Sequence, residues 1–163
     1  MDEQILNQYY QEIAEKIEDV IPVEWYEVAL YIEDVGDVRS LTMYFKEEKE
    51  GEYVYIMDIP EVYGVDEGEY NKRQRELENI CSELRKEFIK QGVEPWNIFE
   101  FYLSNDYTFR VNFTYEYDEN ISDYDRSIVW QYRKLGIMPM GDFEEKILNE
   151  YVDRKTGDLK KKM

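Results

Sequence analysis

The sequence predicts an α+β fold in which helices cover one antiparallel sheet of about five strands. Two apolar patterns lead to this prediction. Some segments repeat apolar residues every three or four positions, as amphipathic helices do, whereas others alternate apolar and polar residues, as half-buried strands do. The alternating segments follow one another through short connections, which is typical of antiparallel meanders and hairpins. The expected order of elements is α-βββ-α-ββ-α-α.

The first half of the chain predicts one helix and then three strands. Helical spacing covers residues 3–21 and ends at Pro22, which cannot continue a helix. Alternation then predicts strands at 25–33, 39–46 and 52–58, joined as a meander. The residues expected to face the core from these segments are Ile5, Tyr9, Ile13, Ile17, Val20, Val28, Leu30, Ile32, Leu41, Met43 and Phe45.

A long helix and a hairpin are predicted next. The helix covers roughly 67–91, and Gly92 is the expected first residue after its end. The hairpin covers 97–117 and turns at Asn105–Asp106. The residues expected to face the core from these two elements are Tyr70, Leu77, Ile80, Cys81, Leu84, Phe88, Phe109, Val111, Phe113, Tyr115 and Tyr117.

Two shorter helices complete the predicted fold. One is capped by Ser122 or Asp123 and closed by Gly136, and the other lies near 142–153. Their expected inner faces consist of Tyr124, Ile128, Val129, Tyr132, Leu135, Phe143, Ile147, Leu148 and Tyr151.

The length of 163 residues predicts a single domain, and we place it at 1–154. Residues 155–163 contain four lysines and one aspartate, so we expect a basic, mobile tail. The chain shows no signal peptide and no apolar run long enough to cross a membrane. Its single cysteine precludes an internal disulfide. These features predict a cytoplasmic protein.

The charge of the chain predicts a basic partner. There are 38 acidic and 20 basic residues and no histidine, which gives a net charge of −18. The electrostatic field of so large a negative charge lowers stability through self-repulsion, but it speeds the encounter with a cationic partner. It repels the phosphates of nucleic acid, so direct nucleic-acid binding is disfavoured. The acidity also has a simpler interpretation, namely that it maintains solubility.

No motif for catalysis, cofactor binding or metal binding stands out. Without histidine and with one cysteine, a structural zinc site is excluded. The acidic stretch from Asp58 to Glu69 does not fit a calcium-binding loop, because Pro60 and the position of its glycines break the pattern. Cys81 lies on a predicted apolar stripe, which favours a buried small hydrophobe over a reactive thiol. We therefore expect no cofactor, no metal and no catalytic residue.

Two acidic regions are candidate binding surfaces. Residues 47–69 hold nine acidic residues and one lysine, and residues 116–125 hold five acidic residues and no basic one. Tyrosines are interleaved with the second region, and aromatic side chains beside charge are typical interface anchors. The predicted contact residues are Asp118, Glu119, Asp123, Tyr124 and Asp125.

Four short motifs then indicate a family. They are YYQEIAEKIEDVIPVEW at 9–25, the Ile-Pro step at 58–60, Glu-Pro-Trp at 94–96 and IVWQYRKLGIMP at 128–139. In this order and spacing they resemble the YezG/EsaG-like immunity proteins, from about residue 5 to residue 140. The resemblance implies a cytoplasmic antitoxin that binds the C-terminal nuclease domain of a cognate LXG-type toxin, exported by a type VII secretion system, and blocks its activity until export.

The motif residues themselves are expected to serve as scaffold, because prolines, glycines and tryptophans of this kind set turns and anchor cores. The predicted function is thus non-covalent inhibition of a nuclease toxin. Two alternatives stay open: a carboxylate-dependent hydrolase, which would need two close carboxylates of unlike burial, and a general acidic adaptor with several basic partners. The sequence leaves open whether the toxin cuts DNA or RNA, and whether its active site or an exosite is bound.

Overall fold

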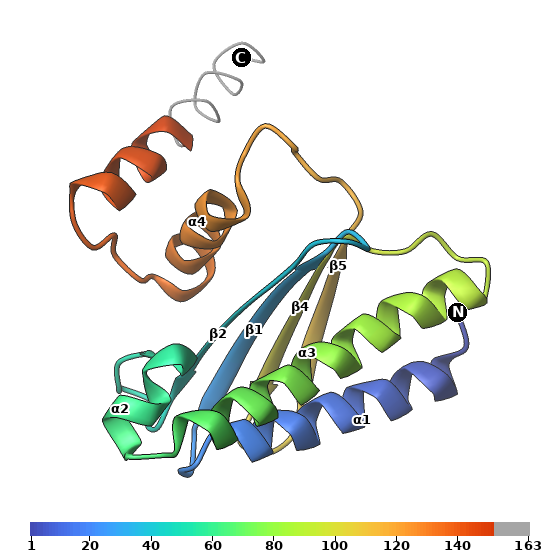
Figure 1. Cartoon of the computed structure of the whole chain (residues 1–163), viewed down its shortest axis with the longest axis horizontal. Coiled ribbons are helices and arrows are strands. Elements are labelled where there is room, and N and C mark those ends of the chain that lie inside the picture. Colours follow the sequence, from blue (N-terminus) through green and yellow to red (C-terminus); the bar gives the residue numbers. More distant parts are fainter. Residues whose placement is uncertain (152–163) are drawn as a thin grey trace. The chain divides into compact units, whose positions relative to one another are not determined.

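The computed structural model of the chain describes residues 1–151. The chain divides into two compact units, which we name unit 1, Met1–Tyr117, and unit 2, which begins at Asp118. The predicted single domain over 1–154 stays a prediction, and the predicted tail at 155–163 lies outside the described residues. The elements of unit 1 are, in chain order, α1 (Glu3–Val20), β1 (Glu27–Asp34), β2 (Arg39–Lys46), β3 (Val54–Tyr55), the 3-10 helix η1 (Ile56–Asp58), α2 (Ile59–Tyr63), α3 (Glu67–Lys90), β4 (Ile98–Ser104) and β5 (Phe109–Thr114) (Figure 1).

The strands of unit 1 form one open sheet in the order β3-β2-β1-β4-β5, and every neighbouring pair is antiparallel. β1 is central, so that Leu30 lies opposite Met43 of β2 on one side and opposite Phe101 of β4 on the other. The first three strands make the predicted meander, and β4 and β5 make the predicted hairpin. The α+β prediction is therefore confirmed, with β3 and β5 as the two edges of the sheet.

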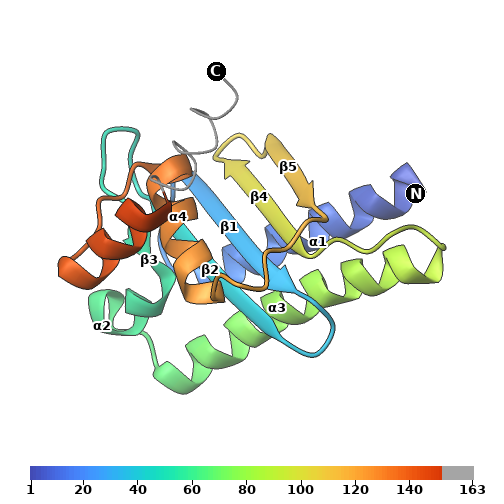
Figure 2. The same ribbon diagram turned by 90° about the horizontal axis from the view of Figure 1, so that it is seen from above.

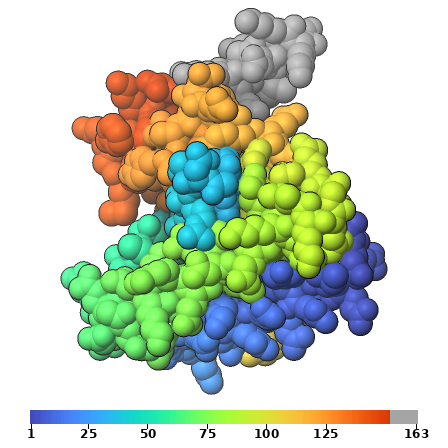
Figure 3. All heavy atoms as spheres, turned by 45° about the vertical axis from the view of Figure 1, so that its right-hand side comes forward, coloured from blue at the N-terminus to red at the C-terminus, as the bar shows by residue number. Residues whose placement is uncertain are grey.

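α1 and α3 lie side by side and cover one face of this sheet (Figure 1), and their surfaces abut in the space-filling view (Figure 3). Among the described residues, 22 buried hydrophobic side chains from these helices, the facing strands and the segments that connect them form one cluster. Ile13 and Ile17 of α1 and Leu77 of α3 are fully buried in it, as the helical spacing predicted. In the view from above, α1 passes behind the β4–β5 hairpin (Figure 2), where its Tyr10 ring packs against Phe101.

The ends of the two long helices are fixed by local hydrogen bonds. The backbone N–H of Gln4 donates to Asp2 Oδ1 at 2.9 Å at the start of α1, and that of Glu69 donates to Asp66 Oδ2 at 3.0 Å at the start of α3. These acidic caps satisfy amide groups that a helix leaves unpaired. Gly92 follows α3 with φ +71°, a conformation that glycine adopts without steric cost, as predicted.

The third strand is much shorter than predicted. Only Val54–Tyr55 pairs with β2, and the chain then enters η1 and α2 rather than continuing as a strand to residue 58. Ile56 and Ile59 are both fully buried at a spacing of three residues, which a helical turn satisfies and an extended strand does not. Pro60 fits the first turn of α2, where a missing N–H costs nothing.

The return strand of the hairpin is also shorter than predicted, because it ends at Thr114 rather than at Tyr117. Thr114 pairs with Ile98, the first residue of β4, so the chain beyond it has no neighbouring strand. Tyr115 is accordingly exposed rather than buried in the sheet. Phe109 is also exposed, since β5 is an edge strand and the helix layer covers it only in part.

Unit 2 contains α4 (Asp123–Leu135) and a helical segment at 142–151 that reaches the end of the described residues. Ser122 is the cap, as one of the two predicted choices, and its Oγ accepts from the N–H of Asp125 at 3.1 Å. A small cluster of buried side chains joins the two helices, consisting of Ile128, Val129, Ile147 and Leu148.

Three predicted inner-face residues of unit 2 are exposed: Tyr124, Tyr132 and Phe143. The buried stripe of α4 is centred on Ile128 and Val129, which leaves the tyrosines outside it. Tyr124 and Phe143 pack against each other instead, with ring centroids 6.4 Å apart. The helical spacing of apolar residues predicted both helices correctly, but the faces it predicted are wider than the faces that are buried.

Candidate functional site

The five predicted contact residues all lie in unit 2, and we name them the 118–125 patch: Asp118, Glu119, Asp123, Tyr124 and Asp125. The structure places them in one stretch, formed by the loop before α4 and the first turn of that helix. Asp118, Glu119 and Tyr124 are exposed, and the other two are half-buried. Acidic side chains in a first helical turn are favoured by the helix dipole, so part of this cluster has a structural reason. Their role as contacts stays a prediction.

Local hydrogen bonds order the 118–125 patch. Asp118 Oδ1 accepts from the N–H of Asn120, and Asp123 Oδ1 accepts from the N–H of Tyr124, both at 2.9 Å. Arg126 donates to the carbonyl oxygen of Asp118 at 2.6 Å. The guanidinium group therefore lies among the acidic residues and reduces the local negative charge.

Most of the net charge of the chain lies in unit 1, which is also the longer unit. Residues 1–117 hold 28 of the 38 acidic residues and 11 of the 20 basic ones, which leaves a net charge of −17. Residues 118–151 hold eight acidic and four basic residues, which leaves −4. The field that the sequence predicts to attract a basic partner thus originates mainly in unit 1, outside the 118–125 patch.

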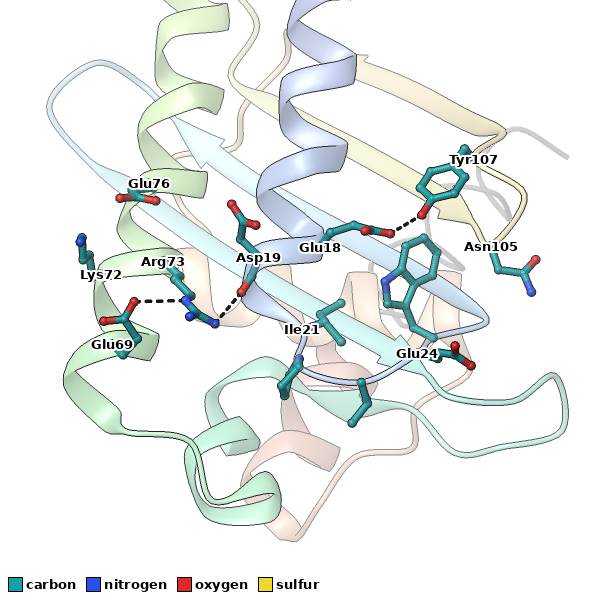
Figure 4. A pocket seen from close by; sticks show the side chains of 13 residues that line it. Glu18, Asp19, Ile21, Glu24, Glu69, Lys72, Arg73, Glu76, Asn105 and Tyr107 are labelled. Carbon is teal, nitrogen blue, oxygen red and sulfur yellow. Dashed lines mark hydrogen bonds and ion pairs between the residues drawn. The ribbon is translucent and has the colours of Figure 1, made fainter.

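Unit 1 contains an open hollow of about 1040 Å³, which we name the α1–α3 hollow (Figure 4). It is formed by the end of α1, the following linker, the first half of α3 and the β4–β5 turn. Arg73 of α3 contacts Glu69 at 3.3 Å and donates to the carbonyl oxygen of Asp19 at 3.1 Å, which ties α3 to the end of α1. The lining residues are Glu18, Asp19, Ile21, Pro22, Val23, Glu24, Trp25, Glu69, Lys72, Arg73, Glu76, Asn105 and Tyr107.

The carboxylates of this hollow do not form an acid–base pair. Glu18, Asp19, Glu24 and Glu69 are exposed, and Glu76 is half-buried with an ammonium group 3.6 Å away. A hydrolase of the kind considered above needs one carboxyl group in a desolvated setting and a second that stays ionised. The carboxyl groups that line the hollow do not differ in burial in this way. Among residues 1–151, no group of three or more Cys, Asp or Glu side chains is placed to hold a metal ion.

Three carboxylates of unit 1 are buried: Glu33 and Asp34 on β1 and Glu100 on β4. Each accepts a hydrogen bond from a neighbouring side chain. The donors are, respectively, the Tyr31 hydroxyl at 2.7 Å, the Ser82 hydroxyl at 2.6 Å and the Asn112 amide at 2.7 Å. These carboxylates are hydrogen-bonded parts of the sheet, and none lines the hollow.

A second depression, of about 480 Å³, runs between α1 and the start of β5. We name it the α1–β5 groove. It shares Glu18 and Tyr107 with the α1–α3 hollow. Its lining residues are Asn7, Tyr10, Gln11, Ala14, Glu15, Glu18, Tyr107 and Phe109.

Tyr107 stands where the hollow and the groove meet (Figure 4). Its hydroxyl donates to Glu18 Oε1 at 2.6 Å, and its ring meets Trp25 edge-on with centroids 6.2 Å apart. The hydrogen bond to the Glu18 carboxylate raises the pKa of Tyr107. Tyr107 was not among the predicted contact residues, because it belongs to no apolar pattern and no acidic cluster. The one signal in the sequence is its position directly after the predicted Asn105–Asp106 turn.

Cys81 is fully buried on α3, and burial raises the pKa of its thiol. Its interpretation as a small hydrophobe in the core is confirmed. Within the part of the chain that the structure describes, no helix combines the length and the hydrophobicity that crossing a membrane requires.

The fold and its surfaces define an acidic α+β protein in which the α1–α3 hollow and the α1–β5 groove both lie in unit 1. Comparison with known proteins identifies its family. The family profile described as "Immunity protein YezG-like" matches residues 6–149, so the chain belongs to the YezG-like immunity protein family. The resemblance inferred from the four motifs is thereby confirmed.

Individual relatives agree with this assignment. The chain is similar to the Immunity protein YezG of Bacillus spizizenii, with 31% identity over 161 residues that cover 98% of this chain and 100% of the relative. It is similar to the protein of the same name from Bacillus subtilis, with 28% identity over 145 residues, 88% of this chain and 96% of the relative. It is also similar to the Type VII secretion system protein EsaG of Staphylococcus aureus, with 30% identity over 148 residues, 87% of this chain and 88% of the relative.

Proposed function

We propose that this protein is a cytoplasmic immunity protein that binds a cognate toxin non-covalently and inhibits its C-terminal nuclease domain. The family match over residues 6–149 carries the proposal, because the relatives are named as immunity proteins. One relative is named as a type VII secretion system protein, which supports an LXG-type toxin exported by such a system as the partner.

The charge distribution supports a nuclease as the target. A nuclease binds phosphates through a cationic surface, and a net charge of −17 in unit 1 attracts such a surface over long range. Association is then steered electrostatically and slows as the salt concentration rises. We further propose the 118–125 patch as one of the contact surfaces, with Tyr124 as its aromatic anchor.

The deciding experiment is co-expression with the toxin encoded beside the gene for this chain. We expect host cells to survive when both are made and to die when the toxin domain is made alone. The purified chain should abolish nuclease activity at an equimolar ratio. Continued killing and undiminished nuclease activity at equimolar ratio would contradict the proposal, as would turnover of a substrate by the purified chain alone.

The site of inhibition is tested by competition. An uncleavable oligonucleotide and this protein should exclude each other on the toxin domain if the protein covers the active site. Simultaneous binding of both would indicate an exosite. Each result is read by size-exclusion chromatography of the mixture with a fluorescent oligonucleotide.

A further inference from the structure

We propose that the α1–β5 groove of unit 1 docks an extended, basic segment of the partner protein. This inference rests on the function proposed above and names the surface and the chemistry by which the toxin is recognised. It adds a contact surface in unit 1 that is distinct from the acidic region at 47–69.

The first observation is an exposed aromatic ring that is held rigidly. Phe109 is 42% exposed, yet its ring stacks on Phe101 with centroids 5.2 Å apart and meets Tyr10 at 5.3 Å. Both supporting rings are buried in the core. A side chain that is already fixed loses little conformational entropy on binding, and aromatic side chains that become buried on binding dominate many protein interfaces.

The second observation is the backbone of Tyr107. The N–H of Tyr107 donates to the carbonyl oxygen of Ser104 and the N–H of Ser104 to that of Thr108, both at 2.9 Å, so the hairpin turn is closed at both ends. Tyr107 has φ +65° in this turn, at a position that glycine usually occupies. The left-handed conformation is sterically unfavourable for a residue with a Cβ atom. Tyr107 is 58% exposed, and its hydrogen bond to Glu18 and its contact with Trp25 hold its ring in a fixed position at the surface.

The third observation is the charge around the groove, which determines the occupant. Glu15 and Glu18 line the groove, and Asp19 and Glu24 line the adjoining α1–α3 hollow. All four are exposed, and among residues 1–151 none of them has an ion pair with a basic side chain. A basic protein segment complements these carboxylates. Nucleic acid is repelled by them, and so is a second copy of this chain, which carries the same charge of −18.

The form of the groove favours an extended segment. The α1 residues that line it run from Asn7 to Glu18, which corresponds to about 16 Å of helix. On the other side the lining consists of Tyr107 and of Phe109, the first residue of β5, and the six residues of that strand continue from there for about 20 Å. Within the described chain β5 pairs only with β4, so its outer backbone groups are available for an added strand. Apolar side chains of that strand would meet Tyr10 and Phe109, and basic ones would meet the carboxylates.

The test uses Tyr107→Asn in the full chain, because asparagine adopts the left-handed conformation readily and preserves the turn. Binding to the purified toxin domain is measured by calorimetry and folding by thermal unfolding. We expect binding at least about 30-fold weaker, as for an interface hot spot, while thermal unfolding stays cooperative. Val38→Asn is the control, since Val38 is 55% exposed in the β1–β2 turn at the other end of the sheet, and its binding should equal that of the wild type.

Tyr124→Asn in the 118–125 patch is the comparison that separates the two surfaces. Wild-type affinity of Tyr107→Asn overturns the groove proposal, whatever Tyr124→Asn does, and leaves the proposed function intact. Absence of any binding by the wild type overturns both. A second measurement does not depend on a variant: amide hydrogen exchange in the complex should slow at 7–18 and 104–110, and unchanged exchange there overturns the groove proposal.

Discussion

The two units of the chain differ in how much core they have and in how much charge they carry. Unit 1 joins 22 buried hydrophobic side chains into one cluster, whereas the described cluster of unit 2 has four. Unit 1 also carries a net charge of −17, against −4 for residues 118–151. Unit 1 therefore combines the greater electrostatic self-repulsion with the larger hydrophobic core, whose packing stabilises it against that repulsion. Both differences follow partly from length, because unit 1 has 117 residues and the described part of unit 2 has 34.

Removing one large core side chain from each unit should give the largest effect. Phe99 is fully buried, and its ring packs against Trp96, Phe101 and Phe113. Phe99→Ala should lower the free energy of unfolding by about 3–5 kcal/mol, because the cavity cannot close among rigid rings. Leu148→Ala in unit 2 should cost about 2 kcal/mol, at the low end for such changes. Urea denaturation followed by circular dichroism measures both, and equal losses would contradict the difference in packing.

Reversing two charges in each unit compares the surfaces at equal net charge. Glu15→Lys with Glu18→Lys alters the α1–β5 groove, and Asp123→Lys with Asp125→Lys alters the 118–125 patch. Each pair changes the net charge from −18 to −14. At low salt we expect association with the toxin domain to slow about tenfold for the groove pair.

The 118–125 pair should slow association less, because Arg126 already offsets part of that patch and most of the field comes from unit 1. Stopped-flow fluorescence at two salt concentrations measures both rates. Equal slowing by the two pairs would mean that only the total charge matters. An unchanged rate for the 118–125 pair would remove that patch from the interface.

The sequence predicted the layers of the fold well, because apolar spacing reports burial directly. The stripe of α1 and the alternation of β1 both reach the core, and Gly92 and Ser122 mark helix ends as predicted. The predictions are wrong where the burial of a residue depends on a neighbouring strand. Tyr115 alternates correctly with Phe113, but its strand has no partner beyond Thr114. Spacing within one segment cannot show where the neighbouring strand begins.

The candidate site was harder to predict for the same reason. The 118–125 patch is contiguous in the sequence and could be found by counting charges. The α1–β5 groove combines Glu15 and Glu18 of the first helix with Tyr107 and Phe109, some 90 residues later. Nothing in the local pattern brings these segments together. Only the pairing of β4 with the central strand β1 carries the hairpin to the side of α1.

The two substitutions with the smallest expected effect on stability test whether the two units unfold separately. Ser122→Ala and Asp66→Ala each remove one capping hydrogen bond, of 3.1 Å at the start of α4 and 3.0 Å at the start of α3. Each should cost about 1 kcal/mol. If the units are independent, calorimetry of the wild type shows two transitions, and each substitution lowers only the one that belongs to its own unit. If the units form the predicted single domain, one transition is seen and both substitutions lower it by similar amounts. Ser122→Ala should then still lower the free energy of unfolding by about 1 kcal/mol. It should shift the unfolding midpoint less than it would in an independent unit 2, because the unfolding entropy of the whole chain exceeds that of a small unit.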